Sequence, residues 1–180
     1  MAYWLMKSEP DLFGIDDLQR VGVEPWDGVR NYQVRNMIRD QMRVGDLAFF
    51  YHSSCITPGI VGIMRIHSAS YPDQTAFDPG HRHYDSKSNP ASPRWYQVDV
   101  AFVTKFAEVI PLSWLKQQPQ LAESPLVRHG NRLSIMSLSE QQWAFISRHA
   151  HRHNCVSRSF HNSPGIAPWL TWTVIAARRY

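Results

Sequence analysis

The sequence predicts an α+β fold in which short strands form a barrel-like mixed sheet with helices at its ends. Apolar and more polar residues nearly alternate over residues 95–106, which is typical of a half-buried strand. The predicted helices do not separate the strands regularly, so a doubly wound parallel sheet is disfavoured. The 180 residues, 43% apolar and 12% aromatic, suit one packed domain or one domain with an appendage.

The N-terminal elements follow from local patterns. Residues 2–7 form an apolar run of strand-forming residues. Residues 15–20 predict a short helix with acidic residues near its N-terminus, where the helix dipole favours them. Asn31 is a suitable N-cap for a second helix over residues 32–42.

Two strands are predicted next, over residues 46–52 and 59–67, joined by a polar turn. Residues 68–94 predict a long loop, and loops of this length are often functional. The remaining elements are the strand over 95–106, a short helix, a short strand and a helix opened by a capping box, at residues 112–117, 132–136 and 140–149.

Charge divides the chain into two parts. Residues 1–149 contain all 15 acidic residues and 15 of the 19 Lys and Arg residues, so this part is formally neutral. The excess of +4 comes from Arg152, Arg158, Arg178 and Arg179. We therefore expect one domain over residues 1–149 and a basic C-terminal extension over 150–180 that need not be well ordered. Any contact with a phosphate backbone would need a local patch on the first part.

The sequence gives no sign of a membrane protein or of a disulfide framework. The first residues lack a long apolar stretch, and the weakly polar run over residues 166–177 is shorter than the ~20 residues that cross a bilayer. Cys55 and Cys155 stand alone. We expect a cytoplasmic protein of bacterial type that does not contact a membrane.

Trp26 is the first candidate for a functional residue, because it stands in a Pro/Asp/Gly turn before a basic helix. Arg30 follows closely, and Arg35, Arg39 and Arg43 recur at four-residue spacing, which would form one helical stripe. This arrangement would suit nucleic acid, because guanidinium groups can hold phosphates and the neighbouring aromatic ring can stack on a base. The other interpretation is a tryptophan folded onto the core and a solvated arginine face.

The aromatic stretch at residues 49–54 offers a second candidate. Tyr51, His52 or Ser53 could bond the edge of a ligand at the polar end of a pocket, or the strand end could simply meet solvent. Serine hydrolase chemistry is disfavoured, because adjacent residues of a strand point to opposite faces and no G-x-S-x-G motif is present. Similarly, Lys7 beside Glu9 is either a surface pair or a pocket rim.

Histidines also recur in patterns that resemble metal ligands, at His81 and His83 and again at His149, His151 and His153 before Cys155. The second group lies where the extension begins and would have to fold around an ion. We expect adventitious metal binding here and no built metal site.

Eight motifs in order resemble the EVE domain family. They are YWLMKSEP, WDGVRNYQVRN, VGDLAFFYHSS, PGIVGI, YPDQTAFDP, HYDSKS, PRWYQVDV and RLSIMSLS, from residue 2 to about residue 148. The resemblance implies a PUA-like fold, a mixed and strongly bent β-barrel surrounded by short helices. The chain departs from the family at Gly62-Ile63-Met64-Arg65 and in its C-terminal extension.

The resemblance also implies a function. EVE domains are similar to YTH domains, which hold a modified base in an aromatic cage, and they are thought to read modified cytosines in DNA. By motif, Trp26 would be a wall of the cage. The other implied ligand-binding positions are Lys7, Ser8, Asn31, Tyr32, Tyr51, His52, Ser53, Gly59, Asp78, Tyr84, Arg132 and Ser134.

We therefore expect a binding module without enzymatic activity and without a cofactor, whose partner is DNA with a modified base. Two alternatives stay open. One is an RNA-binding PUA-like module. The other is an enzyme acting on a modified base or nucleotide, with Tyr51, His52 and either Glu9 or Asp78 transferring protons.

Overall fold

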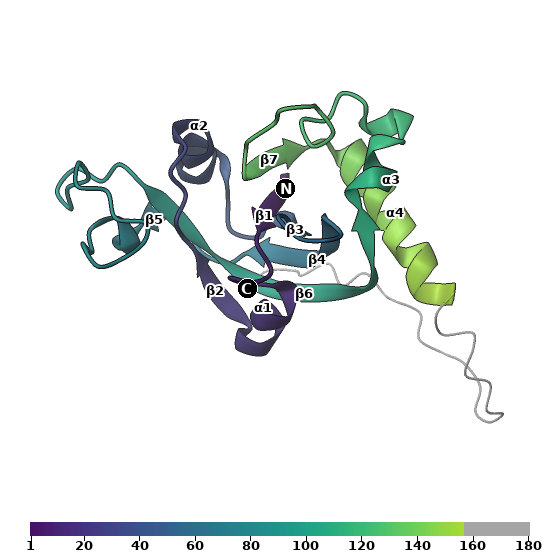
Figure 1. Ribbon diagram of the computed structural model, residues 1–180, viewed down its shortest axis with the longest axis horizontal. Coiled ribbons are helices and arrows are strands. Elements are labelled where there is room, and N and C mark those ends of the chain that lie inside the picture. Colours follow the sequence, from purple (N-terminus) through teal and green to yellow (C-terminus); the bar gives the residue numbers. More distant parts are fainter. Residues whose placement is uncertain (157–180) are drawn as a thin grey trace, which may run out of the picture.

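The computed structural model describes the backbone of residues 1–156 and the side chains of residues 1–152. Seven strands form one mixed sheet in the order β2-β6-β4-β3-β1-β7, with β5 paired to β6 (Figure 1). The strands are β1 (Tyr3–Ser8), β2 (Val23–Trp26), β3 (Leu47–His52), β4 (Gly59–Ile66), β5 (Tyr71–Pro72), β6 (Tyr96–Pro111) and β7 (Ile135–Leu138).

The pairing of β1 with β3 is parallel, and the other pairings of the described sheet are antiparallel. The α+β class with a mixed sheet is therefore confirmed. The sheet is not closed, because its pairing ends at β2 on one side and at β7 on the other within residues 1–156. The strongly bent barrel implied by the family resemblance is not confirmed.

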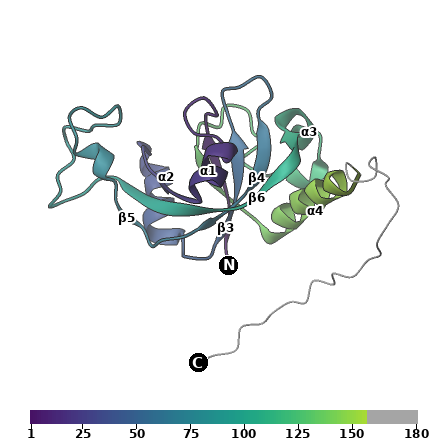
Figure 2. The same ribbon diagram turned by 90° about the horizontal axis from the view of Figure 1, so that it is seen from below.

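The helices pack on the two faces of the sheet. They are α1 (Ile15–Val21), α2 (Tyr32–Asn36), α3 (Leu112–Lys116) and α4 (Glu140–Val156), with a π-helical segment at Met37–Gln41 and 3₁₀ turns at Gln74–Ala76 and Pro119–Leu121. The strand β6 runs across the molecule from the loop beside β5 to α3, and α3 and α4 lie together at its far end (Figures 1 and 2).

Two hydrophobic clusters pack on the two faces of the sheet. Along β3, Ala48 and Phe50 belong to the first cluster, whereas Phe49 and Tyr51 belong to the second. This alternation follows from the period of two in a strand. The first cluster includes residues of α1 and α2, and the second includes residues of α3 and α4. The Trp26 side chain belongs to the first cluster.

The helix expected over residues 32–42 forms, but it changes geometry along its length. The Asn31 side chain caps it by accepting from the Val34 backbone N–H at 3.1 Å. After Asn36 the helix widens into the π-helical segment and ends at Gln41. Arg43 is therefore outside the helix, and the regular stripe expected for Arg35, Arg39 and Arg43 is wrong.

The last helix is longer than expected. The sequence placed its end at His149, but α4 continues to Val156. The physical reason is that Ala150 is buried in the second cluster, so apolar packing continues past His149. The domain boundary expected after residue 149 therefore falls inside α4, and most of the expected extension lies outside the described residues.

The strand β2 was not predicted. Its sequence Val-Glu-Pro-Trp contains a proline, which is unusual inside a sheet but tolerated in an edge strand. Trp26 is the last residue of β2 and pairs with Val98 of β6, so it precedes the turn and does not lie in it. The sheet therefore fixes its backbone.

A buried carboxylate joins the starts of β1 and β3. Asp46 accepts from the Ala2 N–H at 2.8 Å, the Trp4 indole N–H at 3.2 Å and the Arg43 N–H at 3.0 Å. Asp46 keeps 4% of its surface exposed. Its loss would leave these donors without their acceptor.

We predict that Asp46→Ala lowers the free energy of unfolding by about 1–3 kcal/mol, the usual cost of unsatisfied buried donors. Urea unfolding followed by circular dichroism measures this as a lower midpoint. Asp11→Ala is the matched control, because Asp11 is exposed and surface changes usually stay within about 0.5 kcal/mol. Equal midpoints for the two variants would contradict the role given to Asp46.

Candidate functional site

A recess of about 330 Å³ opens where the end of β1, the end of β2 and the loop around residues 81–83 meet. Ligand pockets in proteins begin at about 300 Å³. Its apolar lining is Leu12, Phe13, Pro25 and Trp26, and its polar lining is Lys7, Ser8, Glu24, Asp27, His81, Arg82 and His83. The recess thus combines aromatic walls with charged groups.

The aromatic wall is fixed by the core behind it. The Trp26 ring meets the Phe50 ring edge-on, with the centroids 5.4 Å apart and the planes at 80°. The Phe13 ring lies 6.3 Å from the same Phe50 ring. Trp26 keeps 8% of its surface exposed while it lines the recess. Trp26 therefore packs on the core, as one interpretation expected, and it also borders a cavity.

The turn after Trp26 needs a glycine. Gly28 has φ = 72°, in the left-handed region that L side chains rarely adopt. A Cβ at this position would lie 2.7 Å from the His83 imidazole. Gly28 therefore allows the backbone to turn and allows His83 to pack closely against it. This packing brings residues 81–83 to the recess.

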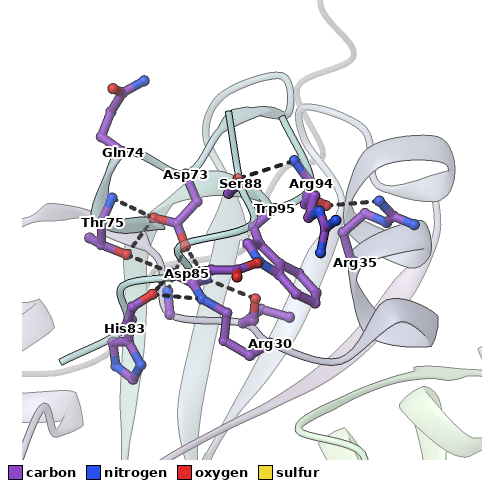
Figure 3. A network of polar contacts seen from close by, with 12 residues as sticks. Arg30, Arg35, Asp73, Gln74, Thr75, His83, Asp85, Ser88, Arg94 and Trp95 are labelled. Carbon is purple, nitrogen blue, oxygen red and sulfur yellow. Dashed lines mark hydrogen bonds and ion pairs between the residues drawn. The ribbon is translucent and has the colours of Figure 1, made fainter. Parts of the chain in front are cut away.

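A buried ion pair connects this turn to the long loop (Figure 3). Asp73 is fully buried and accepts from the Gly28 N–H at 3.0 Å, the Arg30 guanidinium at 2.7 Å, and the Thr75 N–H and hydroxyl at 2.9 and 2.6 Å. Arg30 also donates to the His83 carbonyl. One carboxylate thus holds the turn, the segment before α2 and the loop together.

The electrostatics of Asp73 follow from these contacts. Its burial would raise the pKa, but the hydrogen bonds from Arg30 and Thr75 and the positive charge of Arg30 outweigh burial and hold the pKa below its usual range. Asp73 therefore stays ionised, and Arg30 is engaged within the protein.

A second set of contacts fixes the other end of the loop. The Trp95 indole N–H donates to Asp85 at 2.7 Å, and its ring lies 4.9 Å from the Tyr32 ring. The Arg35 guanidinium donates to the Arg94 carbonyl at 2.8 Å (Figure 3). The long loop predicted over residues 68–94 is therefore tied to the segment before α2 near one end and to α2 itself at the other.

Asp27 and the histidines give the recess its charge. Asp27 keeps exposed surface, yet the surrounding protein desolvates its carboxyl and raises the pKa, and the Asp73 carboxylate acts in the same direction. Desolvation lowers the pKa of His83, and the charges of Arg82 and Arg30 lower it further. Burial also lowers the pKa of Lys7.

Three of the ligand-binding residues expected from the sequence line the recess, namely Lys7, Ser8 and Trp26. The Lys7 ammonium lies 5.7 Å from the centre of the Tyr51 ring. The Ser8 hydroxyl donates to the Phe13 carbonyl at 2.7 Å, which shapes the loop that lines the recess. Phe13, Asp27 and the 81–83 segment were not expected from the sequence to bind a base, although Asp27 lies within WDGVRNYQVRN and His83 begins HYDSKS.

The structure places the strand end at residues 51–53 differently from the polar floor expected. Tyr51 is buried in the second cluster, on the face of the sheet opposite to Trp26, and burial raises its pKa to about 12. The His52 Nε2 accepts from the Ile15 N–H at 3.1 Å and so caps α1. The Ser53 N–H donates to the Ser8 carbonyl at 2.8 Å.

These contacts also separate the proton-transfer groups of the enzyme hypothesis. Glu9 accepts from the Ser54 hydroxyl at 3.1 Å, and Asp78 accepts from the Gly80 N–H at 2.9 Å within its own loop. Neither lines the recess, and Tyr51 and His52 do not line it either. The structure does not bring the four together at this recess.

The remaining expected positions lie outside the recess lining. Asn31 caps α2, and Tyr32 and Tyr84 are exposed. Arg132 is exposed, and the Ser134 carbonyl accepts from the Lys7 N–H at 2.8 Å. The space beside Gly59 holds the β6 backbone, since a Cβ there would lie 2.3 Å from the Ile110 carbonyl oxygen. Gly59 therefore serves strand packing, and its expected approach to a ligand stays a prediction.

The arginines expected at a phosphate backbone have partners of their own. Arg30 is held by Asp73, and Arg35 packs on Tyr32 with 5.1 Å between guanidinium and ring centre. Arg39 is exposed and pairs with Asp40 at 2.7 Å. Arg43 is exposed and donates to the Met42 carbonyl at 2.8 Å and the Asp40 carbonyl at 2.7 Å.

Two further expectations concern metal binding and membrane contact. No group of three His, Cys, Asp or Glu side chains there is placed to hold a metal ion. The His81 and His83 rings lie 5.5 Å apart as a pair, and His153 and Cys155 fall outside the described side chains. No helix among the described residues is long and apolar enough to cross a membrane.

The structure is a small α+β domain with an open mixed sheet and an aromatic recess at its strand ends. The chain belongs to the EVE domain family, whose model matches residues 2–149. Human thymocyte nuclear protein 1 is 41% identical over 163 residues, which cover 81% of this chain and 72% of that protein.

Solved structures agree with this assignment. A protein from Pseudomonas putida is 54% identical with a TM-score of 0.81, and the match covers 83% of this chain and 99% of that chain. Human THYN1, solved in complex with DNA that contains 5-methylcytosine, is 40% identical with a TM-score of 0.76, covering 83% and 98%. At 12% identity, a YTH domain from Zygosaccharomyces rouxii shares the fold with a TM-score of 0.51, covering 83% and 86%.

We predict that Gly28→Ala lowers the free energy of unfolding more than Gly130→Ala does. Both residues have positive φ, but a Cβ at Gly130 meets nothing within 4 Å. Strain at such a position costs about 1–3 kcal/mol in both variants, and only Gly28→Ala also displaces His83. Urea unfolding of both measures the difference, and adding His83→Ala to Gly28→Ala should remove the excess. Equal losses in the two single variants would contradict the packing role.

We also predict that stability falls on acidification through His52. Desolvation by burial lowers the pKa of this side chain, so the folded state binds its proton less readily than the unfolded state. The stabilising contribution is full above the unfolded pKa of about 6.5 and is lost as the pH falls below it towards the folded pKa. Unfolding in urea at pH 7.5 and 5.5 measures the loss.

His52→Gln tests the assignment, since the amide oxygen can still accept from the Ile15 N–H but does not titrate. This variant should lose less stability between the two pH values than the wild type. His67→Gln is the control, because His67 is exposed. An unchanged loss in His52→Gln would assign the pH dependence to other groups.

Proposed function

We propose that this domain binds a modified cytosine, rotated out of a DNA strand, in the recess beside Trp26 and that it does so without catalysis. The observation that carries the proposal is the aromatic recess at the strand ends of a chain 40% identical to human THYN1, which was solved with 5-methylcytosine DNA. The similarity to a YTH domain supports placing the fold in the PUA-like class.

The energetics favour a wall that is rigid before the base arrives. Taking a base out of the stack costs a few kcal/mol, which stacking and edge hydrogen bonds must offset. An aromatic ring contributes roughly 1–3 kcal/mol per stacked base. Phe50 holds Trp26 in place, so little conformational entropy is lost when a base stacks there.

The two central proton-transfer groups of the enzyme hypothesis, Tyr51 and His52, lie away from the recess. The His52 Nε2 is used to cap α1, and Tyr51 lies on the other face with a pKa of about 12. A general base must reach the proton it takes, and neither group borders the recess. A cytoplasmic location stays a prediction.

Phosphate contacts are proposed for the exposed arginines near the recess and on the helical segment. Arg82 is exposed at the recess and makes no hydrogen bond or ion pair with other described residues. Arg39 and Arg43 are exposed further along. Arg30 instead positions the loop through Asp73. Such contacts make binding weaker at higher salt, whatever the base.

We predict that Trp26→Ala weakens binding of an oligonucleotide with one 5-methylcytosine about 10- to 100-fold, the loss of roughly 1–3 kcal/mol of stacking. Fluorescence anisotropy at fixed salt gives the affinity, with unmodified DNA and an RNA of the same sequence as competitors. Trp26→Phe should retain part of the affinity. Thermal melting of each variant separates lost binding from lost folding, since Trp26 also packs on Phe50.

Trp114→Ala is the matched control, because Trp114 is a partly buried tryptophan that lies in another pocket with Phe145 and His149. It should leave the affinity unchanged. Equal binding of modified and unmodified DNA, unaffected by Trp26→Ala, would reject the proposal. Tighter binding of the RNA would assign the recess to RNA.

A further inference from the structure

We propose that Asp27 reads the edge of the bound base and makes the recess select cytosine bases over thymine. The inference rests on the function proposed above and names the residue that sets its specificity. Asp27 directly follows Trp26 and lines the same recess. It would accept a hydrogen bond from the exocyclic amino group at position 4 of the base.

A reader of 5-methylcytosine needs such a residue for a chemical reason. Thymine has the same ring size and the same methyl group at position 5, so neither a stacking wall nor a methyl pocket can tell the two bases apart. They differ at position 4, where cytosine presents an N–H donor and thymine a carbonyl acceptor. An acceptor fixed opposite position 4 bonds cytosine and faces the lone pairs of thymine.

Asp27 and Glu24 are the two carboxylates of the recess lining, and neither has a hydrogen-bond or ion-pair partner among the described residues. Asp17, Asp40, Asp46, Asp73 and Asp85 each accept hydrogen bonds within the protein. The Asp27 carboxylate makes no hydrogen bond or ion pair with other residues in the described part of the chain. Its acceptor capacity is therefore free for a ligand.

The backbone at Asp27 is held firmly enough for selection. The sheet pairing of Trp26 with Val98 fixes one side, and the hydrogen bond from Gly28 to buried Asp73 fixes the other. The backbone therefore places the Asp27 carboxylate at the recess, and a carboxylate that faces a base edge without a donor loses a hydrogen bond.

The surroundings of Asp27 add to its need for a donor. Desolvation and the nearby Asp73 carboxylate disfavour its ionised form and raise the pKa. A hydrogen bond from the amino group of a base would stabilise the ionised Asp27 carboxylate, which receives no hydrogen bond from the described residues. The other charged groups that face it are His81, His83 and Arg30, and Arg30 is already engaged by Asp73.

Glu24 is the other carboxylate that lines the recess. It lies on β2 two residues before Trp26, and it too makes no hydrogen bond or ion pair with other described residues. Asp27 is preferred because the Gly28 to Asp73 bond fixes the turn that carries it. Glu24→Gln is therefore the matched comparison for Asp27→Asn.

The test uses the full chain and three single-stranded oligonucleotides that differ at one position, which holds 5-methylcytosine, cytosine or thymine. Single strands avoid differences in base pairing. The wild type should bind the 5-methylcytosine strand about 10-fold or more tightly than the thymine strand, as expected for one edge contact. In Asp27→Asn this ratio should fall towards one, because an amide can turn to accept from an amino group or donate to a carbonyl.

Glu24→Gln should keep the wild-type ratio, and melting temperatures should show that both variants fold. A wild-type ratio retained in Asp27→Asn, or lost in Glu24→Gln instead, overturns the role of Asp27. A wild type that prefers 5-methylcytosine to cytosine but binds thymine equally well overturns it also, while the proposed function stands. Equal affinity of the wild type for all three strands overturns both.

Discussion

The Asp73 carboxylate is the constraint on which the recess depends. It is fully buried, and it receives hydrogen bonds from Gly28, Arg30 and Thr75, which belong to two chain segments far apart in sequence. Removing one partner of a buried ion pair typically costs several kcal/mol, because the other charge is left uncompensated. The turn after Trp26 and the loop that carries His83 are therefore coupled through one group.

This coupling explains why a recess lined by loops can be preorganised. The Trp26 ring rests on Phe50, and the facing residues 81–83 are held by the Arg30 bond to the His83 carbonyl and by the packing of His83 on Gly28. A ligand that enters does not need to order these segments, so less of its interaction energy is lost.

The parts of the fold with a strong local pattern were predictable from sequence. The strands β3 and β4 and the first part of β6 follow from apolar runs and alternation, and Asn31 follows from capping chemistry. The strand β2 could not be predicted, because its four residues include Pro25 and its pairing partner β6 is about 70 residues away in sequence. The π-helical segment has no sequence signal in local propensity.

The site was only partly predictable, for a related reason. Trp26, Lys7 and Ser8, which their motifs suggested, line the recess, whereas Tyr51, expected at its floor, lies in the cluster on the other face of the sheet. An aromatic run such as residues 49–51 fills both faces of a strand, so the pattern does not show which side borders a cavity. Asp73 was missed because nothing local distinguishes a loop carboxylate that will be buried by Arg30 from one that stays in solvent.

The sheet and the loops supply different parts of the recess lining, and this difference bears on specificity. The stacking wall belongs to the first hydrophobic cluster, so a change at Trp26 or Phe50 disturbs the core as well as the recess. Asp27 and Arg82 are exposed on a turn and a loop, and neither contributes to a hydrophobic cluster. Substitutions there cost little stability, because surface positions usually do. Under the proposed function, such a domain can change which base edge it accepts while keeping the same aromatic wall.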